Sequence, residues 1–281
     1  MKLSFFVGAA LAVGLAVPAA AQDARSRTDE GKLSGDYLAV GVGAGYGPSY
    51  EGSDDYVVFP VPLVQGRFHG VDINPRGGGL ALDFIPDPPN GVGFNLGVAG
   101  KVRLTRTHDT HDVVVNRLGE LKTAIEVGPT VGVSFPHLLN PYDTLTFTTD
   151  VLWDVGGAYK GMVVDPLVSY STPLSRGILA NLSLNAEWGD RKFAHYYYSI
   201  TPAQSAVSGL PVFHAGSGFN KAGARLLLGI DLDGDLTNGG PAIFVLGGYT
   251  RQLGDGKLTP LTSIRGSADQ FLGAVGVGYT F

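Results

Sequence analysis

The last eleven residues constrain the fold of this chain most, because they alternate between two kinds of side chain. Residues 271–281 read FLGAVGVGYTF, and most of the larger apolar side chains share one parity: Phe271, Val275, Val277, Tyr279 and Phe281. Side chains of a strand point alternately to its two faces, so one face here is aromatic and aliphatic while the other is mostly small or polar. The pattern predicts a transmembrane β-strand that faces lipid and a crowded lumen, and that closes against the first strand of a barrel.

The composition agrees with this interpretation. Of the 281 residues 44% are hydrophobic and only 16% are charged, and 42 are glycines, which let strands curve and leave room in a lumen. Beyond the first residues no apolar run is long enough for a transmembrane helix. The absence of cysteine excludes a disulfide framework and a thiolate metal site. A net charge of −5 without a basic stripe argues against nucleic acid as a partner.

The first 36 residues are predicted to lie outside the barrel. Lys2 precedes an apolar run, and Pro18 is followed by three alanines, so residues 1–21 are predicted to form a signal peptide with an A-x-A cleavage site. The alternative, an N-terminal membrane anchor, is disfavoured because the run is short. Residues 22–36 are polar and mixed in charge, and are predicted to form a flexible periplasmic segment. Residues 37–281 would then form the barrel in the outer membrane of a Gram-negative cell.

Period-two alternation recurs along the rest of the chain, which predicts an all-β, antiparallel transmembrane barrel. Eleven runs are visible, covering residues 37–47, 57–68, 71–84, 92–104, 121–135, 145–155, 162–172, 178–188, 222–232, 241–252 and 271–281. A barrel with both ends in the periplasm needs an even number, so we expect twelve strands, with ten as the next alternative. Either residues 192–219 hide a strand or one early run is not a strand. Several runs are longer than a soluble all-β sandwich needs.

Charged residues on the inward parity could line or fill the lumen. They are Arg67, Lys101, Arg103, Lys122, Glu126, Asp150, Asp154, Glu187, Arg225 and Asp231. One hypothesis is a selectivity lining or a proton relay, and the other is a plug of paired charges, because a narrow barrel fills with its own side chains. Both signs occur in similar numbers, which favours the plug. Pro60 and Pro62 predict that the run at 57–68 is frayed at its start or lies at the rim.

Other motifs point to no metal, cofactor or catalytic site. THDTHD contains His108 and His111 in H-x-x-H spacing, which is a weak zinc signal in a stretch that resembles a solvated loop. The acidic residues of the stretch from Asp231 to Asp235 lack the glycine position and closing glutamate of a calcium loop, so we expect a turn. The six histidines fall in predicted turns or loops without a G-x-S-x-G motif, so a lipid-hydrolysing enzyme is the least favoured hypothesis.

Two loops carry a family resemblance. YEGSDDY at 50–56, followed by PVPLV, and YYYSITPAQSAVSGLPVF at 196–213 resemble the MipA/OmpV family of MltA-interacting outer-membrane proteins, and the resemblance spans essentially the whole mature chain. The positions that carry it are Tyr50, Gly52, Ser53, Asp54, Asp55, Tyr197, Tyr198, Ser199, Ser208 and Gly209. The closing loop LGDGKLTPLTS at 253–263 departs from the family pattern. Without the family, the tyrosine cluster would be read as an interfacial aromatic girdle.

The resemblance implies a non-enzymatic role. One member of the family resembles a scaffold that joins a lytic murein transglycosylase to a bifunctional penicillin-binding protein, and other members are described as adhesins or osmotic-response proteins. Expected partners are outer-membrane lipid, the barrel-assembly machinery, and a murein hydrolase with a penicillin-binding protein. Tyr279 and Phe281 resemble the C-terminal signal of outer-membrane assembly. A small diffusion channel and an adhesin remain the alternatives to the scaffold.

Overall fold

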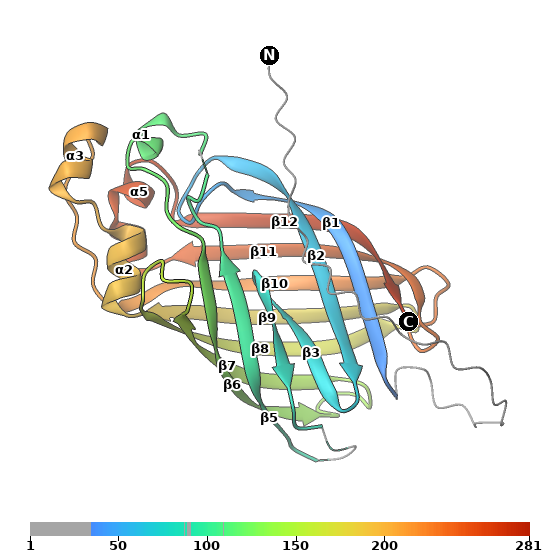
Figure 1. Cartoon of the computed structure of the whole chain (residues 1–281). Helices are drawn as coiled ribbons and strands as arrows, with labels where there is room; N and C mark the ends of the chain where they lie inside the picture. The colour runs from blue at the N-terminus through green and yellow to red at the C-terminus, as the bar shows by residue number, and fades with distance from the viewer. Residues whose placement is uncertain (1–34, 87, 89–90, 109) are drawn as a thin grey trace, which may run out of the picture. The chain divides into compact units, whose positions relative to one another are not determined.

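The computed structural model describes residues 35–281 apart from 87, 89, 90 and 109, so the predicted signal peptide and most of the predicted periplasmic segment lie outside the described residues. The described part forms a closed barrel of twelve strands (Figure 1). The strands are β1 (Tyr37–Pro48), β2 (Tyr56–Phe68), β3 (Val71–Arg76), β4 (Gly79–Asp83), β5 (Gly93–Arg103), β6 (Ala124–Pro136), β7 (Thr144–Asp154), β8 (Met162–Ser175), β9 (Ile178–Gly189), β10 (Gly218–Asp231), β11 (Gly240–Gln252) and β12 (Asp269–Thr280).

Each strand pairs antiparallel with its neighbour in sequence, and β1 pairs with β12 to close the barrel. The closing register runs from Ala39 opposite Thr280 to Tyr46 opposite Gly273. The predicted all-β barrel of twelve antiparallel strands, with its last strand against its first, is therefore confirmed. No helix of the described residues is long and apolar enough to cross a bilayer.

The twelfth strand lies where the sequence suggested one kinked run. Residues 71–84 form the two strands β3 and β4, which meet at a tight turn where Gly78 has a φ of +85°. The glycines of this run therefore reverse the chain instead of kinking it, because glycine enters the left-handed region without strain. Residues 192–219, the other candidate for a missing strand, contain helices and only the first residues of β10.

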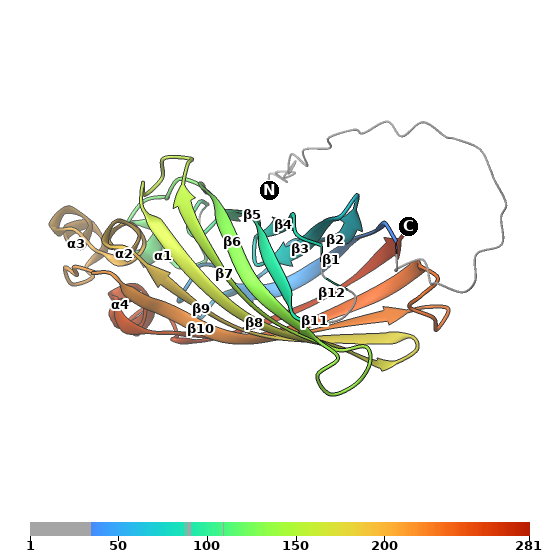
Figure 2. The same ribbon diagram turned by 90° about the horizontal axis from the view of Figure 1, so that it is seen from below.

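The connections differ between the two ends of the barrel. Short turns and the C-terminus lie at one end, which we call the terminal end, and the helices lie at the other, which we call the loop end (Figures 1 and 2). The described helices are α1 (Val113–Asn116), α2 (Arg191–Tyr198), α3 (Pro202–Ser208), α4 (Gly254–Leu258) and α5 (Pro260–Ser263).

Alternation along each strand separates an apolar outer face from the lumen. On β5, Phe94 and Leu96 are 64% and 51% exposed, whereas Ala99 and Arg103 are buried. The outer face is thus apolar and the lumen takes the charged side chains, which is the reverse of a soluble protein.

The glycine-rich inner faces of β1 and β12 make room for two aromatic rings. A β-carbon at Gly45 would lie 2.8 Å from the Phe59 ring, and one at Gly43 would lie 2.8 Å from the ring of Phe244. Both distances are shorter than a carbon–carbon contact allows. The bare face of the terminal strands therefore receives Phe59 and Phe244, which fill this side of the lumen.

Candidate functional site

A cluster of ion pairs inside the lumen, near the loop end, is the candidate site. Arg103 on β5 lies at its centre with a side chain that is 3% exposed. Its Nε lies 2.9 Å from Oε1 of Glu126 on β6, and its Nη2 lies 2.7 Å from Oε2 of Glu187 on β9. Glu126 and Glu187 are 0% and 2% exposed. Because β7 and β8 lie between β6 and β9, the guanidinium joins two strands that are not neighbours. A planar guanidinium suits this role because it donates in several fixed directions.

A side chain from the loop between β1 and β2 completes the cluster. Glu51 Oε1 lies 2.7 Å from Arg103 Nη1 and 2.6 Å from Nζ of Lys221 on β10. Burial alone would raise the pKa of Glu51, but Lys221 and Arg103 hold it below its usual range. The loop carboxylate therefore stays ionised and bound inside the barrel.

Two further side chains extend the cluster toward β8. Lys101 Nζ lies 2.8 Å from Oδ2 of Asp165 on β8 and 3.2 Å from Oε2 of Glu187. In the described residues the cluster thus contains three cations, Lys101, Arg103 and Lys221, and four anions, Glu51, Glu126, Asp165 and Glu187. Such near balance is what makes buried charges tolerable, because each one is paired.

Helix α2 covers the cluster with aromatic rings. Its N-cap is Asp190, which accepts a hydrogen bond from the Phe193 amide. The guanidinium carbon of Arg103 lies 4.8 Å from the centre of the Phe193 ring and 5.5 Å from that of Tyr197. The Tyr198 hydroxyl donates to Glu51 at 3.2 Å, and burial together with this carboxylate raises the pKa of Tyr198. These rings exclude water from the charges and favour the cation by cation–π attraction.

The opposite side of the lumen is filled at the loop end as well. Gln252 of β11 and Gln270 of β12 are 1% and 5% exposed, and the Gln252 amide donates to Gln270 at 3.2 Å. Gln270 donates in turn to the backbone oxygen of Ser53. Ion pairs on one side, and amides and aromatic rings on the other, therefore occupy the lumen beneath the loops.

The inward charges that the sequence suggested do not all join the cluster. Lys101, Arg103, Glu126 and Glu187 belong to it. The others lie elsewhere. Asp150 forms an ion pair with Arg76 at 2.8 Å, Arg67 forms one with Asp72, and Arg225 lies against Gly77. Asp154 and Asp231 accept hydrogen bonds from backbone amides at turns, and Lys122 lies in the loop before β6.

Three members of the cluster were not in the predicted set. Lys221 shares the inward parity of Arg225 on β10, so the alternation could have found it. Asp165 on β8 could have been found in the same way, had that strand shown a clear alternation. Glu51 lies within the family motif at 50–56, but the alternation does not single it out, because it lies in a loop and only tertiary structure carries its side chain inward.

The family-motif residues build the packing of the loops at the loop end. The Tyr50 hydroxyl donates to the carbonyls of Leu261 and Arg265, and Ser53 forms a backbone bridge with Gly266. In the first motif, Gly52 has a φ of +97°, Asp54 is exposed, and the Asp55 amide donates a hydrogen bond to the Ser53 hydroxyl. In the second motif, the Tyr197 ring lies over Arg103, the Tyr198 carbonyl accepts a hydrogen bond from Thr259, and the Ser199 hydroxyl accepts one from the Ala215 amide. The Ser208 hydroxyl donates to the Gln204 carbonyl, and Gly209 caps α3 with a φ of +79°.

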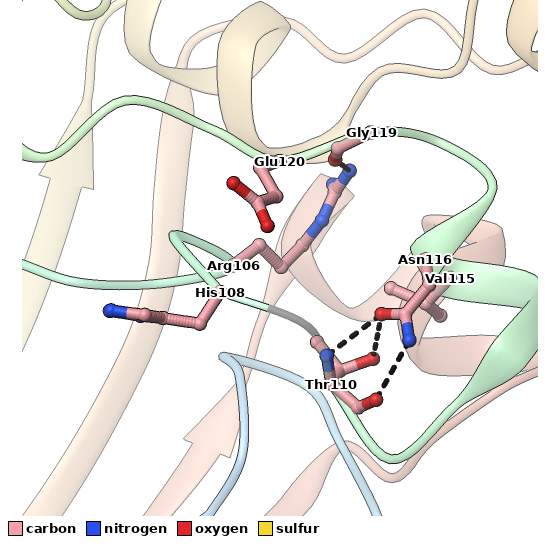
Figure 3. A pocket seen from close by; sticks show the side chains of 7 residues that line it. All are labelled: Arg106, His108, Thr110, Val115, Asn116, Gly119 and Glu120. Carbon is pink, nitrogen blue, oxygen red and sulfur yellow. Dashed lines mark hydrogen bonds between the residues drawn. The ribbon is translucent and has the colours of Figure 1, made fainter. Parts of the chain in front are cut away.

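Of the two histidines in H-x-x-H spacing, His108 lines a cavity of only about 10 Å³ (Figure 3). His108 points away from the Thr110–Asn116 pair, and Asp112 caps α1 and bonds Arg265 at 2.8 Å. Such a cavity has room for one water molecule at most. No group of three potential metal-ligating residues occurs in the described part of the chain. The stretch from Asp231 to Asp235 forms a turn, in which Asp231 accepts backbone amides.

A closed antiparallel barrel with an apolar outer face and charged lumen defines a transmembrane β-barrel protein, the class found in bacterial outer membranes. The family model "MltA-interacting protein MipA" matches residues 40–281. The chain therefore belongs to the MipA family of outer-membrane proteins, as its loop motifs suggested.

Other comparisons give remote likeness only. No curated protein matches the chain. Among solved structures, the COG4313 outer membrane channel from Pseudomonas putida F1 is 12% identical, with 92% of this chain and 100% of that chain covered and a TM-score of 0.44. OprD from Pseudomonas aeruginosa is 11% identical, with 90% and 97% covered and a TM-score of 0.28.

Proposed function

We propose that this protein is a non-enzymatic interaction protein of the outer membrane that links a murein hydrolase to a murein synthase of the penicillin-binding class. The observation that carries the proposal is the filled lumen, where Arg103, Glu126 and Glu187 are almost completely buried under α2. A diffusion channel needs a continuous water path along its axis. Fixed ion pairs and rings in that path favour a protein that works through its surfaces.

The terminal end is the side that would meet murein enzymes. Outer-membrane barrels place short turns and both chain ends in the periplasm and longer loops outside. The turn between β6 and β7 presents three exposed apolar side chains there: Leu138, Leu139 and Tyr142 are 52%, 77% and 79% exposed. Exposed apolar groups on a stiff turn are typical of contact sites for proteins.

Asp143 holds this turn in one conformation. Its carboxylate accepts the amides of Leu138, Leu139 and Asn140 and the hydroxyl of Tyr170. Burial alone would raise the pKa of Asp143, but these hydrogen bonds lower it. The apolar side chains are thus presented with little loss of conformational entropy on binding.

Conductance of the folded protein in a planar bilayer tests the first half of the proposal. We expect a silent bilayer from protein whose heat-modifiable mobility shows that the barrel is folded. Stepwise ion currents from the same preparation would contradict the proposal that the lumen is closed and would support a channel.

Capture of murein enzymes tests the second half. Full-length protein in outer-membrane vesicles should retain a purified lytic transglycosylase and a bifunctional penicillin-binding protein, and L139E should weaken retention at least tenfold. The matched control is V207E, which puts the same charge on an exposed residue of α3 at the loop end. No retention by the wild type, or equal loss in both variants, would contradict the assignment of this turn. Absence of labelling by a serine-directed probe is the expected result for a non-enzymatic barrel.

A further inference from the structure

The wall of the barrel is interrupted beside β2. This strand pairs with β1 from Tyr56 to Arg67, but with β3 only from Gly66 to Phe68. The β3–β4 hairpin ends at Gly77 and Gly78, whereas β2 continues to the loop end (Figure 1). Over residues 56–65, no described strand pairs with the second edge of β2. We call this interruption, between β2 and β5 above the hairpin, the notch.

The free edge of β2 is suited to an apolar environment. Unpaired backbone groups are costly in lipid, and soluble proteins protect free edges with charges. Residues 56–64 read YVVFPVPLV and contain no charged side chain. Pro60 and Pro62 bring no N–H to the strand, which removes two donors that an edge in lipid could not satisfy.

The inner face of β2 is apolar too. Phe59, Val61 and Leu63 alternate with the exposed outward residues of this strand and are only partly exposed. On β5, β6 and β9 the inward positions near the loop end carry Arg103, Glu126 and Glu187 instead. Both faces of β2 beside the notch are therefore apolar.

A cation lies at the hairpin tip that borders the notch. Arg225 reaches from β10 across the lumen to the β3–β4 turn, where a β-carbon on Gly77 would lie 2.7 Å from its Nη1. Within the described residues Arg225 makes no hydrogen bond or ion pair. The carboxylates of Asp165 and Glu187 attract it electrostatically from a distance, but they already form ion pairs with Lys101 and Arg103. Its neighbour on the inward face of β10 is the apolar Leu227.

We propose that the notch is a lateral binding site for a single-chain amphiphile from the membrane, with an anionic carboxylate or phosphate head on Arg225 and its alkyl chain along Phe59, Val61 and Leu63. A guanidinium with free N–H groups binds such a head through two parallel hydrogen bonds. The alkyl chain stays in apolar surroundings all the way from the bilayer, so entry costs little desolvation. Ion conduction is not required, since the path opens through the wall.

Photolabelling with a diazirine-bearing palmitate tests the site in full-length protein reconstituted into phosphatidylcholine vesicles. We expect saturable labelling of peptides from β2 and the β3–β4 hairpin, competed by palmitate or lysophosphatidate but not by hexadecanol. The stronger competitor identifies the head group as carboxylate or phosphate. R225Q should reduce saturable labelling at least about tenfold, the loss expected for a charge-assisted contact. R251Q, on the outer face of β11, is the matched control and should label like the wild type.

Three results would overturn the proposal. They are labelling confined to outward residues such as Tyr46 or Phe271, equal competition by hexadecanol, and undiminished labelling of R225Q. V61W provides a second variant that blocks the apolar path without touching Arg225, and it should also lose saturable labelling. Heat-modifiable mobility verifies that each variant is folded. Murein-enzyme capture by the same variants should stay at the wild-type level, so this proposal and the proposed function fail independently.

Discussion

Glu51 Oε1 lies 2.7 Å from Nη1 of Arg103, so a loop residue at one end of the barrel completes an ion-pair cluster inside the lumen. The contact anchors the loop that carries the family motif to the barrel wall. One guanidinium can hold this carboxylate together with Glu126 and Glu187 because its donors point in several directions.

Replacing Arg103 should destabilise the barrel strongly. R103M leaves three carboxylates, Glu51, Glu126 and Glu187, without their shared cation in a buried site. Breaking a buried pair in this way costs about 3–5 kcal/mol of the free energy of unfolding. Urea titration in detergent, read by the loss of the folded band on a gel, measures the change.

The control for this experiment is R251M. Arg251 pairs with Asp269 on the outer surface, where the two side chains are 49% and 45% exposed. Exposed pairs contribute little, so the free energy of unfolding should change by less than about 1 kcal/mol. A similar decrease of the free energy of unfolding in both variants would contradict the stabilising role of the buried cluster around Arg103.

Acid should loosen the loop that contains α1. Burial alone would raise the pKa of Asp112, but the hydrogen bonds from Arg265 and from the amides of Val115 and Val114 lower it. Because the pKa of Asp112 is lower in the folded state, its contacts stabilise the loop fully at a pH above the ordinary carboxyl pKa of 3.8. This stabilisation is lost as the pH falls through the lower pKa of the folded state. Limited proteolysis at 104–123 with an acid-active protease should therefore accelerate below about pH 4.

D112N should remove most of this pH dependence, with faster cleavage already at neutral pH. The exposed neighbour His111 provides the matched variant H111N, which should keep the wild-type profile. An unchanged profile in D112N would contradict the role of the Asp112–Arg265 contact.

A methyl group on Gly45 of β1 should destabilise the barrel, because an aromatic ring already occupies the lumen beside it. G45A places its β-carbon against the Phe59 ring and Val61, and overpacking of this kind costs about 1–3 kcal/mol. F59L shortens the obstructing side chain, so G45A/F59L should recover most of the loss relative to F59L alone. Thermal unfolding in detergent measures all three variants.

Gly273, on the outer face of β12, is the control, because no atom lies within 4 Å of the position that a β-carbon would take there. G273A should therefore be close to neutral. If G45A were equally harmless, the glycine rows would have a role other than receiving rings.

Deletion of Phe281 should impair assembly in cells more than stability in detergent. Phe281 and Tyr279 are 66% and 48% exposed on the outer face, with ring centres 4.7 Å apart. Little packing is lost with the ring, whereas a terminal assembly signal would be lost entirely. We expect a several-fold lower amount of folded barrel in outer membranes and near-normal refolding of purified chain, and equal effects in both assays would contradict the signal.

The sequence alone determined the class of fold, because alternation is a local property. Strand side chains point to two sides whatever the chain does next, so residues 92–104 reveal a lipid face and a lumen face directly. The loop motifs at 50–56 and 196–213 likewise indicated the family, which the family model confirms. The strand count was harder, since Gly77 and Gly78 look the same in a kink and in a turn.

Only the tertiary structure decided which charges meet. Strand parity places the side chains of Arg103 and Glu187 in the same lumen, but the stagger of the strands decides that they form an ion pair. The same stagger places Asp154 and Asp231 at turns, where they accept hydrogen bonds from backbone amides. Glu51 is the clearest case, because a loop residue has no parity and its direction depends on how the loop packs against α5 and β12 through Tyr50 and Ser53. Local pattern thus fixed the faces of the strands, and long-range packing fixed the plug.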